Sequence, residues 1–69
     1  MSRKHRIKNY TWVNGNLYVE EHIADSLELA KEIARSRGPH SYKIFDEITK
    51  EVMFSEILVE TGNQVPEYA

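Results

Sequence analysis

The chain has 69 residues, no cysteine, 29% charged residues and a net charge of −2 at pH 7. This length allows one small domain with a single core, and the absence of cysteine excludes a disulfide framework and a zinc–thiolate site. We expect a protein of a reducing, cytoplasmic compartment. No apolar run has the length that a membrane span requires, and the basic start does not lead into the apolar segment of an export signal.

The charge is unevenly distributed along the chain. Four of the nine cations fall in the first eight residues, which contain no carboxylate: Arg3, Lys4, Arg6 and Lys8. We predict that residues 1–6 form a basic flexible arm ahead of an acidic body. Such an arm suits nucleic acid or an acidic partner, and a plain solubilising terminus is the alternative.

The first predicted element is a β-hairpin that turns at Asn14-Gly15, since this dipeptide between β-rich segments is typical of a two-residue hairpin turn. We expect strands over residues 7–13 and 17–23. Because paired residues share a face, the turn predicts two sets of neighbours. They are Trp12–Leu17 and Tyr10–Val19 on an apolar face, and Thr11–Tyr18 and Asn9–Glu20 on a mixed face.

A helix is predicted next, because Asp25 and Glu28 have the spacing of a capping box. Its apolar residues recur at intervals of three and four and form one stripe: Leu27, Leu29, Ala30, Ile33 and Ala34. Gly38-Pro39 ends the helix, since glycine favours a helix C-terminus and proline cannot continue it. The helix therefore connects the first hairpin to the segment that follows Pro39.

A second hairpin is predicted over residues 41–57, with a turn over residues 46–51. If residues 47–50 form the loop, Phe45 pairs with Val52, and the next two pairs are Ile44–Met53 and Lys43–Phe54. Lys50 falls where glycine would be easier, so the turn is expected to be slightly strained.

The fold class expected from these elements is α+β. We predict a single ββαββ domain over residues 7–58, with a four-stranded, mainly antiparallel sheet and one helix packed on one face. The helix is expected on the face of Tyr10, Trp12, Leu17 and Val19. Residues 59–69 lose periodicity and are predicted to form a flexible tail, in which Val65 and Tyr68 are the apolar anchors. The sequence leaves the strand order open.

The second hairpin suggests the function, because both of its faces carry large apolar side chains and one helix covers only one side of a sheet. We predict a non-enzymatic protein-interaction module with an open sheet face, acting as a homodimer or on another protein. The expected contact residues are Tyr18, Phe45, Val52 and Phe54. The alternative is a β-bulge near the turn that returns Phe45 or Phe54 to the core.

Motifs for catalysis or cofactor binding are not recognisable in the sequence. His5, His22 and His40 lie in separate segments without ligand spacing, so no metal is expected. There is no glycine-rich phosphate loop and no nucleophile motif around any serine, so neither an enzyme, a cofactor nor a small-molecule substrate is predicted.

Nucleic-acid binding by Arg3, Lys4, Arg6 and Lys8 is the alternative function. Tyr10 and Trp12 follow this basic segment, as stacking rings do in single-strand binders, but they are expected in the core. The pI of about 5.9 and the acidic strands also disfavour this function. A structural subunit of a larger assembly is the third possibility.

Residues 26–55 combine three segments: the helix Ser-Leu-Glu-Leu-Ala-Lys-Glu-Ile-Ala from Ser26, the strand Tyr-Lys-Ile-Phe-Asp from Tyr42, and the return Glu-Val-Met-Phe-Ser from Glu51. This combination resembles small uncharacterised accessory proteins of tailed bacteriophages, cyanophages among them. It departs from them at Lys50, where their turns usually have glycine. The resemblance implies a small protein that acts by binding, on a host protein in the host cytoplasm, and it implies no catalytic residues.

Overall fold

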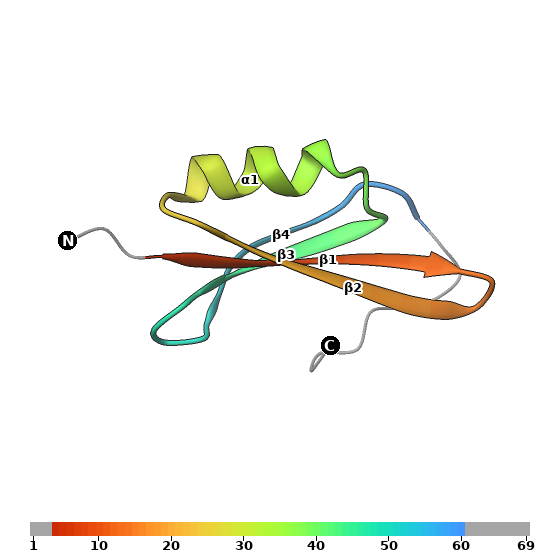
Figure 1. Ribbon diagram of the computed structural model, residues 1–69, viewed down its shortest axis with the longest axis horizontal. Coiled ribbons are helices and arrows are strands. Elements are labelled where there is room, and N and C mark those ends of the chain that lie inside the picture. The colour runs from red at the N-terminus through yellow and green to blue at the C-terminus, as the bar shows by residue number, and fades with distance from the viewer. Residues whose placement is uncertain (1–3, 61–69) are drawn as a thin grey trace.

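The computed structural model describes residues 4–60, and the ββαββ order expected from the sequence is confirmed (Figure 1). The elements are β1 (His5–Val13), β2 (Asn16–Ala24), α1 (Leu27–Ser36), β3 (Ser41–Asp46) and β4 (Val52–Ile57). Arg3 of the predicted arm and residues 61–69 of the predicted tail lie outside the described residues. His5 and Arg6 belong to β1, so the boundary predicted for the basic arm is wrong by two residues.

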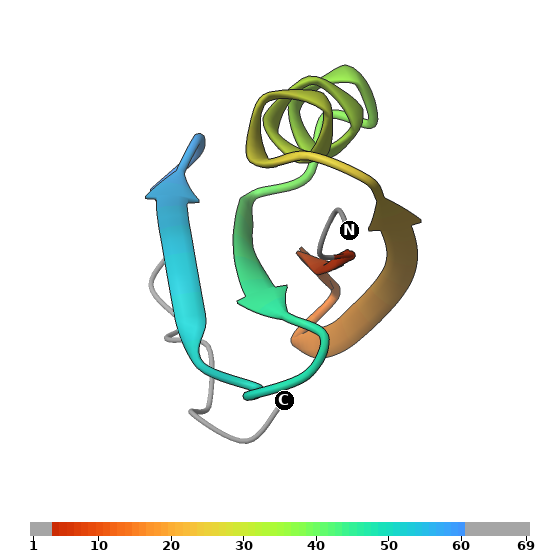
Figure 2. The same cartoon turned by 90° about the vertical axis from the view of Figure 1, so that its left-hand side faces the viewer.

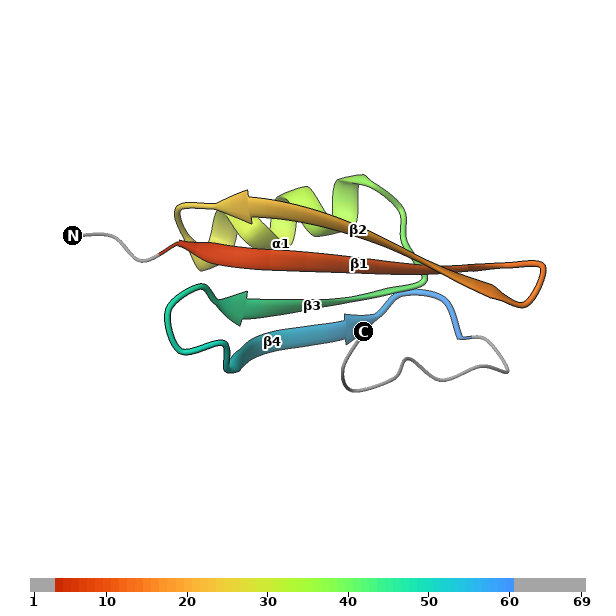
Figure 3. The ribbon, with the colours of Figure 1, turned by 60° about the horizontal axis from the view of Figure 1, so that its bottom comes forward.

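The four strands form one antiparallel sheet in the order β2-β1-β3-β4, which places β1 and β3 at its centre (Figure 3). β2 and β3 run parallel to each other on either side of β1, and α1 connects them. This connection is right-handed (Figure 3). Nearly all crossovers between parallel strands have this hand, because it lets the helix pack back onto the twisted sheet.

The first hairpin has the predicted turn and the predicted register. Asn14 and Gly15 have φ angles of 52° and 80°, as a two-residue turn with two left-handed residues requires. All four expected pairs are present: Trp12–Leu17, Tyr10–Val19, Thr11–Tyr18 and Asn9–Glu20. The local turn chemistry therefore fixed which side chains share a face.

The helix begins one residue later than the capping-box prediction, and its N-cap is Ser26 instead of Asp25. Ser26 has extended backbone angles, and its Oγ accepts a hydrogen bond of 3.1 Å from the Leu29 N–H. In this geometry the hydroxyl of an N-cap serine accepts a hydrogen bond from the backbone N–H of the third helical residue. At the other end Gly38 has a φ of 65°, so the helix ends at the predicted glycine.

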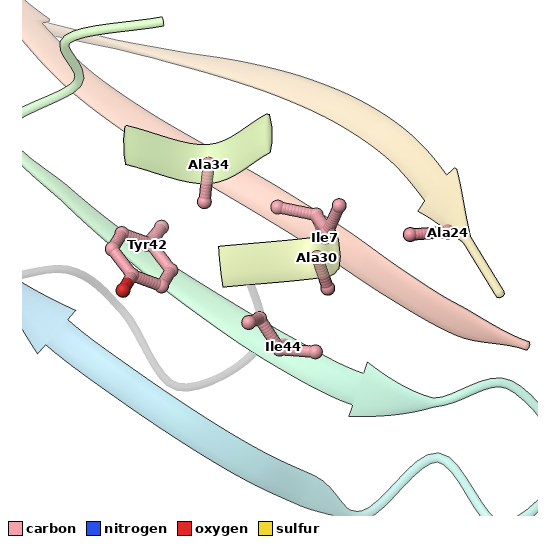
Figure 4. Close-up of a cluster of buried hydrophobic side chains, with 6 residues drawn as sticks. All are labelled: Ile7, Ala24, Ala30, Ala34, Tyr42 and Ile44. Carbon is pink, nitrogen blue, oxygen red and sulfur yellow. The ribbon is translucent and has the colours of Figure 1, made fainter. Parts of the chain in front are cut away.

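The predicted helix face is wrong, because α1 covers the opposite side of the sheet. Figure 2 shows α1 nearly end-on above the strands, and Figure 4 shows the cluster beneath it. In this cluster two alanines of α1, Ala30 and Ala34, lie over three larger strand residues, Ile7, Tyr42 and Ile44. The buried cluster comprises Ile7, Ala24, Ala30, Ala34, Tyr42 and Ile44. Alternation along β1 and β2 then puts the predicted core residues, Tyr10, Trp12, Leu17 and Val19, on the face without a helix. Tyr10 is nevertheless fully buried there, as predicted.

The second hairpin contains a β-bulge, the alternative considered from the sequence. Phe45 pairs with Val52 as predicted, but Ile44 pairs with Phe54 and leaves Met53 as the extra residue of β4. The predicted pairs Ile44–Met53 and Lys43–Phe54 are therefore wrong, and Lys43 pairs with Ser55 instead. A bulge shifts the register by one residue, so it reverses the face of each residue beyond it.

The turn before β4 is held by Asp46. The Asp46 Oδ1 accepts hydrogen bonds from the backbone N–H groups of Ile48 (2.8 Å) and Thr49 (3.0 Å). Lys50 has a φ of 64°, which confirms that a side chain occupies a position suited to glycine. Lys50 thus carries the backbone strain that the sequence predicted.

Candidate interaction surface

The side of the sheet opposite α1 is the candidate functional surface, which we call the open face; Figure 3 views the sheet from this side, with α1 behind the strands. It is defined by the strand registers, because directly paired residues lie on the same face. Its members are Arg6, Lys8, Tyr10, Trp12, Leu17, Val19, Glu21, Ile23, Ser41, Lys43, Phe45, Val52, Ser55 and Ile57.

Exposed aliphatic side chains follow the two edge strands of the open face. On β2, Val19 and Ile23 are 43% and 46% exposed, and on β4, Val52 and Ile57 are 53% and 70% exposed. Single exposed apolar residues are ordinary, but grouped ones on a single face mark surfaces that bind a partner. We call these two edges of the open face its rims; Glu21 lies between the two aliphatic residues of β2, and Ser55 between those of β4.

Between these rims the central strands carry cations above aromatic rings. Lys8 and Lys43 are paired directly across β1 and β3. The Lys8 Nζ lies 5.5 Å from the centroid of the Phe45 ring, and the Lys43 Nζ lies 5.9 Å from that of Tyr10. Both ammonium groups are within range of a favourable cation–π interaction. Tyr10 is fully buried, and burial raises the pKa of its hydroxyl to about 12.

A cluster of charges lies at the end of the open face nearest the β3–β4 turn. The Arg6 guanidinium donates two hydrogen bonds to the Glu47 carboxylate, of 2.8 and 2.9 Å, and one of 3.1 Å to Glu21. The hydrogen bonds from Arg6 lower the pKa of Glu47 to about 2, and the same contacts raise the pKa of Arg6. This fork ties the start of β1 to the turn.

The predicted contact residues divide between the two sides of the sheet. Phe45 and Val52 lie on the open face, together with Tyr10 and Trp12, which were expected on the opposite face. Tyr18 pairs with Thr11 and lies on the helix side, where it is exposed beyond the buried cluster. Phe54 also lies on the helix side and packs against that cluster. The structure therefore does not bring the four predicted residues together on one surface.

The basic residues of the predicted nucleic-acid site also have different surroundings. Lys4 is exposed, Arg6 is held by Glu47 and Glu21, and Lys8 lies on the open face. Lys43 was not predicted as a site residue, although it lies directly opposite Lys8. Finding it required the pairing of β1 with β3, which the sequence did not reveal.

On the helix side a second polar cluster joins α1 to β4. The Glu56 carboxylate accepts hydrogen bonds from the Tyr42 hydroxyl (2.6 Å) and from Arg35 Nε (2.9 Å). The bond from Tyr42, followed by that from Arg35, lowers the pKa of Glu56, while burial raises the pKa of Tyr42. These contacts satisfy the polar atoms at the edge of the core and are structural.

Two of the three histidines have hydrogen-bond partners, whereas the buried Nδ1 of His5 has none within residues 4–60. The His40 Nδ1 accepts a hydrogen bond of 3.1 Å from the Trp12 N–H, and the His22 ring lies 2.8 Å from the Glu20 carboxylate. Within residues 4–60 there is no group of three side chains arranged to hold a metal ion. The same part of the chain has no helix of the length and hydropathy needed to cross a membrane.

Comparison of the chain with protein-family models, with curated proteins and with solved structures gives no match. The case for a function therefore depends on the surface itself.

Proposed function

We propose that this protein is a small non-enzymatic binding module that contacts a protein partner through the open face of its sheet. The observation that carries the proposal is the division of the sheet into two faces. α1 packs over one face, while the other exposes aliphatic side chains along both rims. Exposed apolar rims of this kind favour burial against another protein surface.

The central lysines make a different protein a better partner than a second copy of this chain. In a homodimer with its twofold axis through the middle of the open face, Lys8 and Lys43 would face the same two residues of the other copy. Like charges brought together in an interface oppose association. The resemblance of residues 26–55 to small phage proteins favours a bacterial host protein as the partner, bound in the host cytoplasm.

Capture from a bacterial lysate with matched variants tests this proposal. Val19 on the open face and Leu29 on the helix are both 43% exposed. Glutamate at either position therefore adds the same charge and should lower the free energy of unfolding by a similar amount. We expect Val19→Glu to lose proteins that both the wild type and Leu29→Glu retain. A set of retained proteins that is the same for all three would contradict the proposal. Circular dichroism establishes that each variant is folded.

Nucleic-acid binding is a second candidate, because Trp12 is half-buried on the open face and does not lie in the core under the helix. Its ring therefore shares a surface with Lys8 and Lys43, as stacking rings and cations do in single-strand binders. Trp12 is the only tryptophan, so its fluorescence reports on this surface. Affinity for a thymidine oligonucleotide that falls steeply with salt would favour this candidate over a protein partner.

A further inference from the structure

Lys8 and Lys43 form an unusual pair, because two like charges lie directly opposite each other on the central strands. Such a pair destabilises a sheet unless something offsets the repulsion. The two side chains lean apart, Lys8 toward Phe45 and Lys43 toward Tyr10. The rings thus relieve the repulsion without supplying any negative charge.

No carboxylate within residues 4–60 forms an ion pair with either lysine. Glu21 lies directly opposite Lys8 on β2, but its carboxylate binds Arg6 at 3.1 Å. Glu47, the other carboxylate at this end, contacts Arg6 and Lys50. The centre of the open face therefore carries two half-buried positive charges whose nearest carboxylates already have partners.

We infer that Lys8 and Lys43 form a subsite for one carboxylate of an extended acidic segment in the protein partner. The inference depends on the proposed function and adds the chemistry that the partner must present. An aspartate or glutamate of that segment would be attracted by both ammonium groups. Apolar side chains on either side of it would contact the rims at Val19 and Ile23 on β2 and at Val52 on β4.

A single carboxylate suits this subsite better than a nucleic-acid strand. A strand carries a phosphate at every nucleotide, and those beyond the lysines would meet Glu21 and Glu47 at one end of the open face. Arg6, which could bind a phosphate with its fork, already holds Glu47 in that way. Lysine acts as a point charge and contacts a single carboxylate without such a fork.

A displayed library of random dodecapeptides, selected against the whole protein, tests the inference. We expect the wild type to enrich peptides that have aspartate or glutamate flanked by apolar residues. Peptides selected in this way should bind about tenfold more weakly to the Lys8→Met/Lys43→Met double variant, as measured by Trp12 fluorescence. Methionine keeps the apolar stem of lysine above each ring and removes only the charge.

Lys31→Met is the matched control, because the Lys31 Nζ also lies over a ring, 4.2 Å from the centroid of Phe54, but on the helix side. It should leave peptide affinity unchanged. Apolar peptides without acidic enrichment would overturn the subsite and leave the proposed function standing. Selected peptides that bind Val19→Glu as well as the wild type would overturn both. Tight, salt-sensitive binding of a thymidine oligonucleotide, lost in the double variant, would overturn the peptide assignment in favour of nucleic acid.

Discussion

Phe54 lies directly opposite Ile44 across β3 and β4, and this pairing places its ring on the helix side of the sheet. The centroid of the Phe54 ring is 6.1 Å from that of Tyr42, and the Lys31 ammonium covers the ring from α1. Met53, the bulged residue beside it, is 46% exposed. One inserted residue thus decides that Phe54 contributes to folding and not to the open face.

The first prediction is that Phe54→Ala lowers the free energy of unfolding by about 2 kcal/mol, because it removes a half-buried ring from the edge of the core. Phe54→Glu should cost more, since it also brings a charge against apolar side chains. Urea denaturation measures both variants. Met53→Ala is the control and should change stability by less than about 1 kcal/mol. A Phe54→Glu variant as stable as the wild type would show that the ring is not part of the core.

The second prediction concerns the start of α1. Ser26→Ala removes the hydroxyl that accepts from the Leu29 N–H, so it should cost about 1 kcal/mol of stability. Asp25→Ala should cost less than about 0.5 kcal/mol, because Asp25 retains only the interaction of its charge with the helix dipole. Thermal unfolding of the two variants separates these effects. The opposite ranking would restore Asp25 as the capping residue.

The third prediction is that Asn9→Val stabilises the protein. Asn9 is 2% exposed, and neither its amide nitrogen nor its amide oxygen has a hydrogen-bond partner within residues 4–60. Replacing an unsatisfied buried amide by an apolar group should raise the free energy of unfolding by about 1–2 kcal/mol. Thr11→Val, on the same strand and the same face, controls for the β-preference of valine. Equal gains at both positions would mean that the amide is not destabilising.

The fourth prediction follows from the lowered pKa of Glu47. Its carboxyl has a pKa of about 2 in the folded protein against an ordinary value of 4.5, so the folded state keeps the charge that the unfolded state loses. The contribution of this group is therefore fully present above pH 4.5 and is lost as the pH falls toward 2. The urea midpoint of Glu47→Gln should lie below that of the wild type at neutral pH and converge with it in acid. Glu51→Gln, in the same turn but outside any ion pair within residues 4–60, should show no such convergence.

Local chemistry explains why several features could be predicted. Asn14-Gly15 adopts the left-handed angles of a two-residue turn at low cost, so it fixed the register of the first hairpin. Gly38 ended the helix for the same kind of reason. The choice between Asp25 and Ser26 as the N-cap was not predictable, because both residues suit that position and their difference is small.

The candidate site was less predictable, because it depends on contacts between segments that are distant in sequence. The pairing of Phe45 with Val52 was predicted correctly, since both residues adjoin the turn, but the two residues share a face with Tyr10 and Trp12 and not with Tyr18. Phe54, two residues further along β4, was misplaced by the bulge at Met53. Lys43 was missed because its significance comes from Lys8, which reaches it only through the pairing of β1 with β3.

The sequence by itself determined the order of the elements and the two turns, because turn residues and apolar periodicity act over a few neighbouring positions. Only the tertiary structure decided which face α1 covers. Once β3 pairs with β1, the right-handed connection from β2 places α1 over the face of Ile7 and Ile44. The large side chains of Tyr10 and Trp12 on the other face do not change this. The strand order thus determined which residues pack under the helix and which lie on the open face.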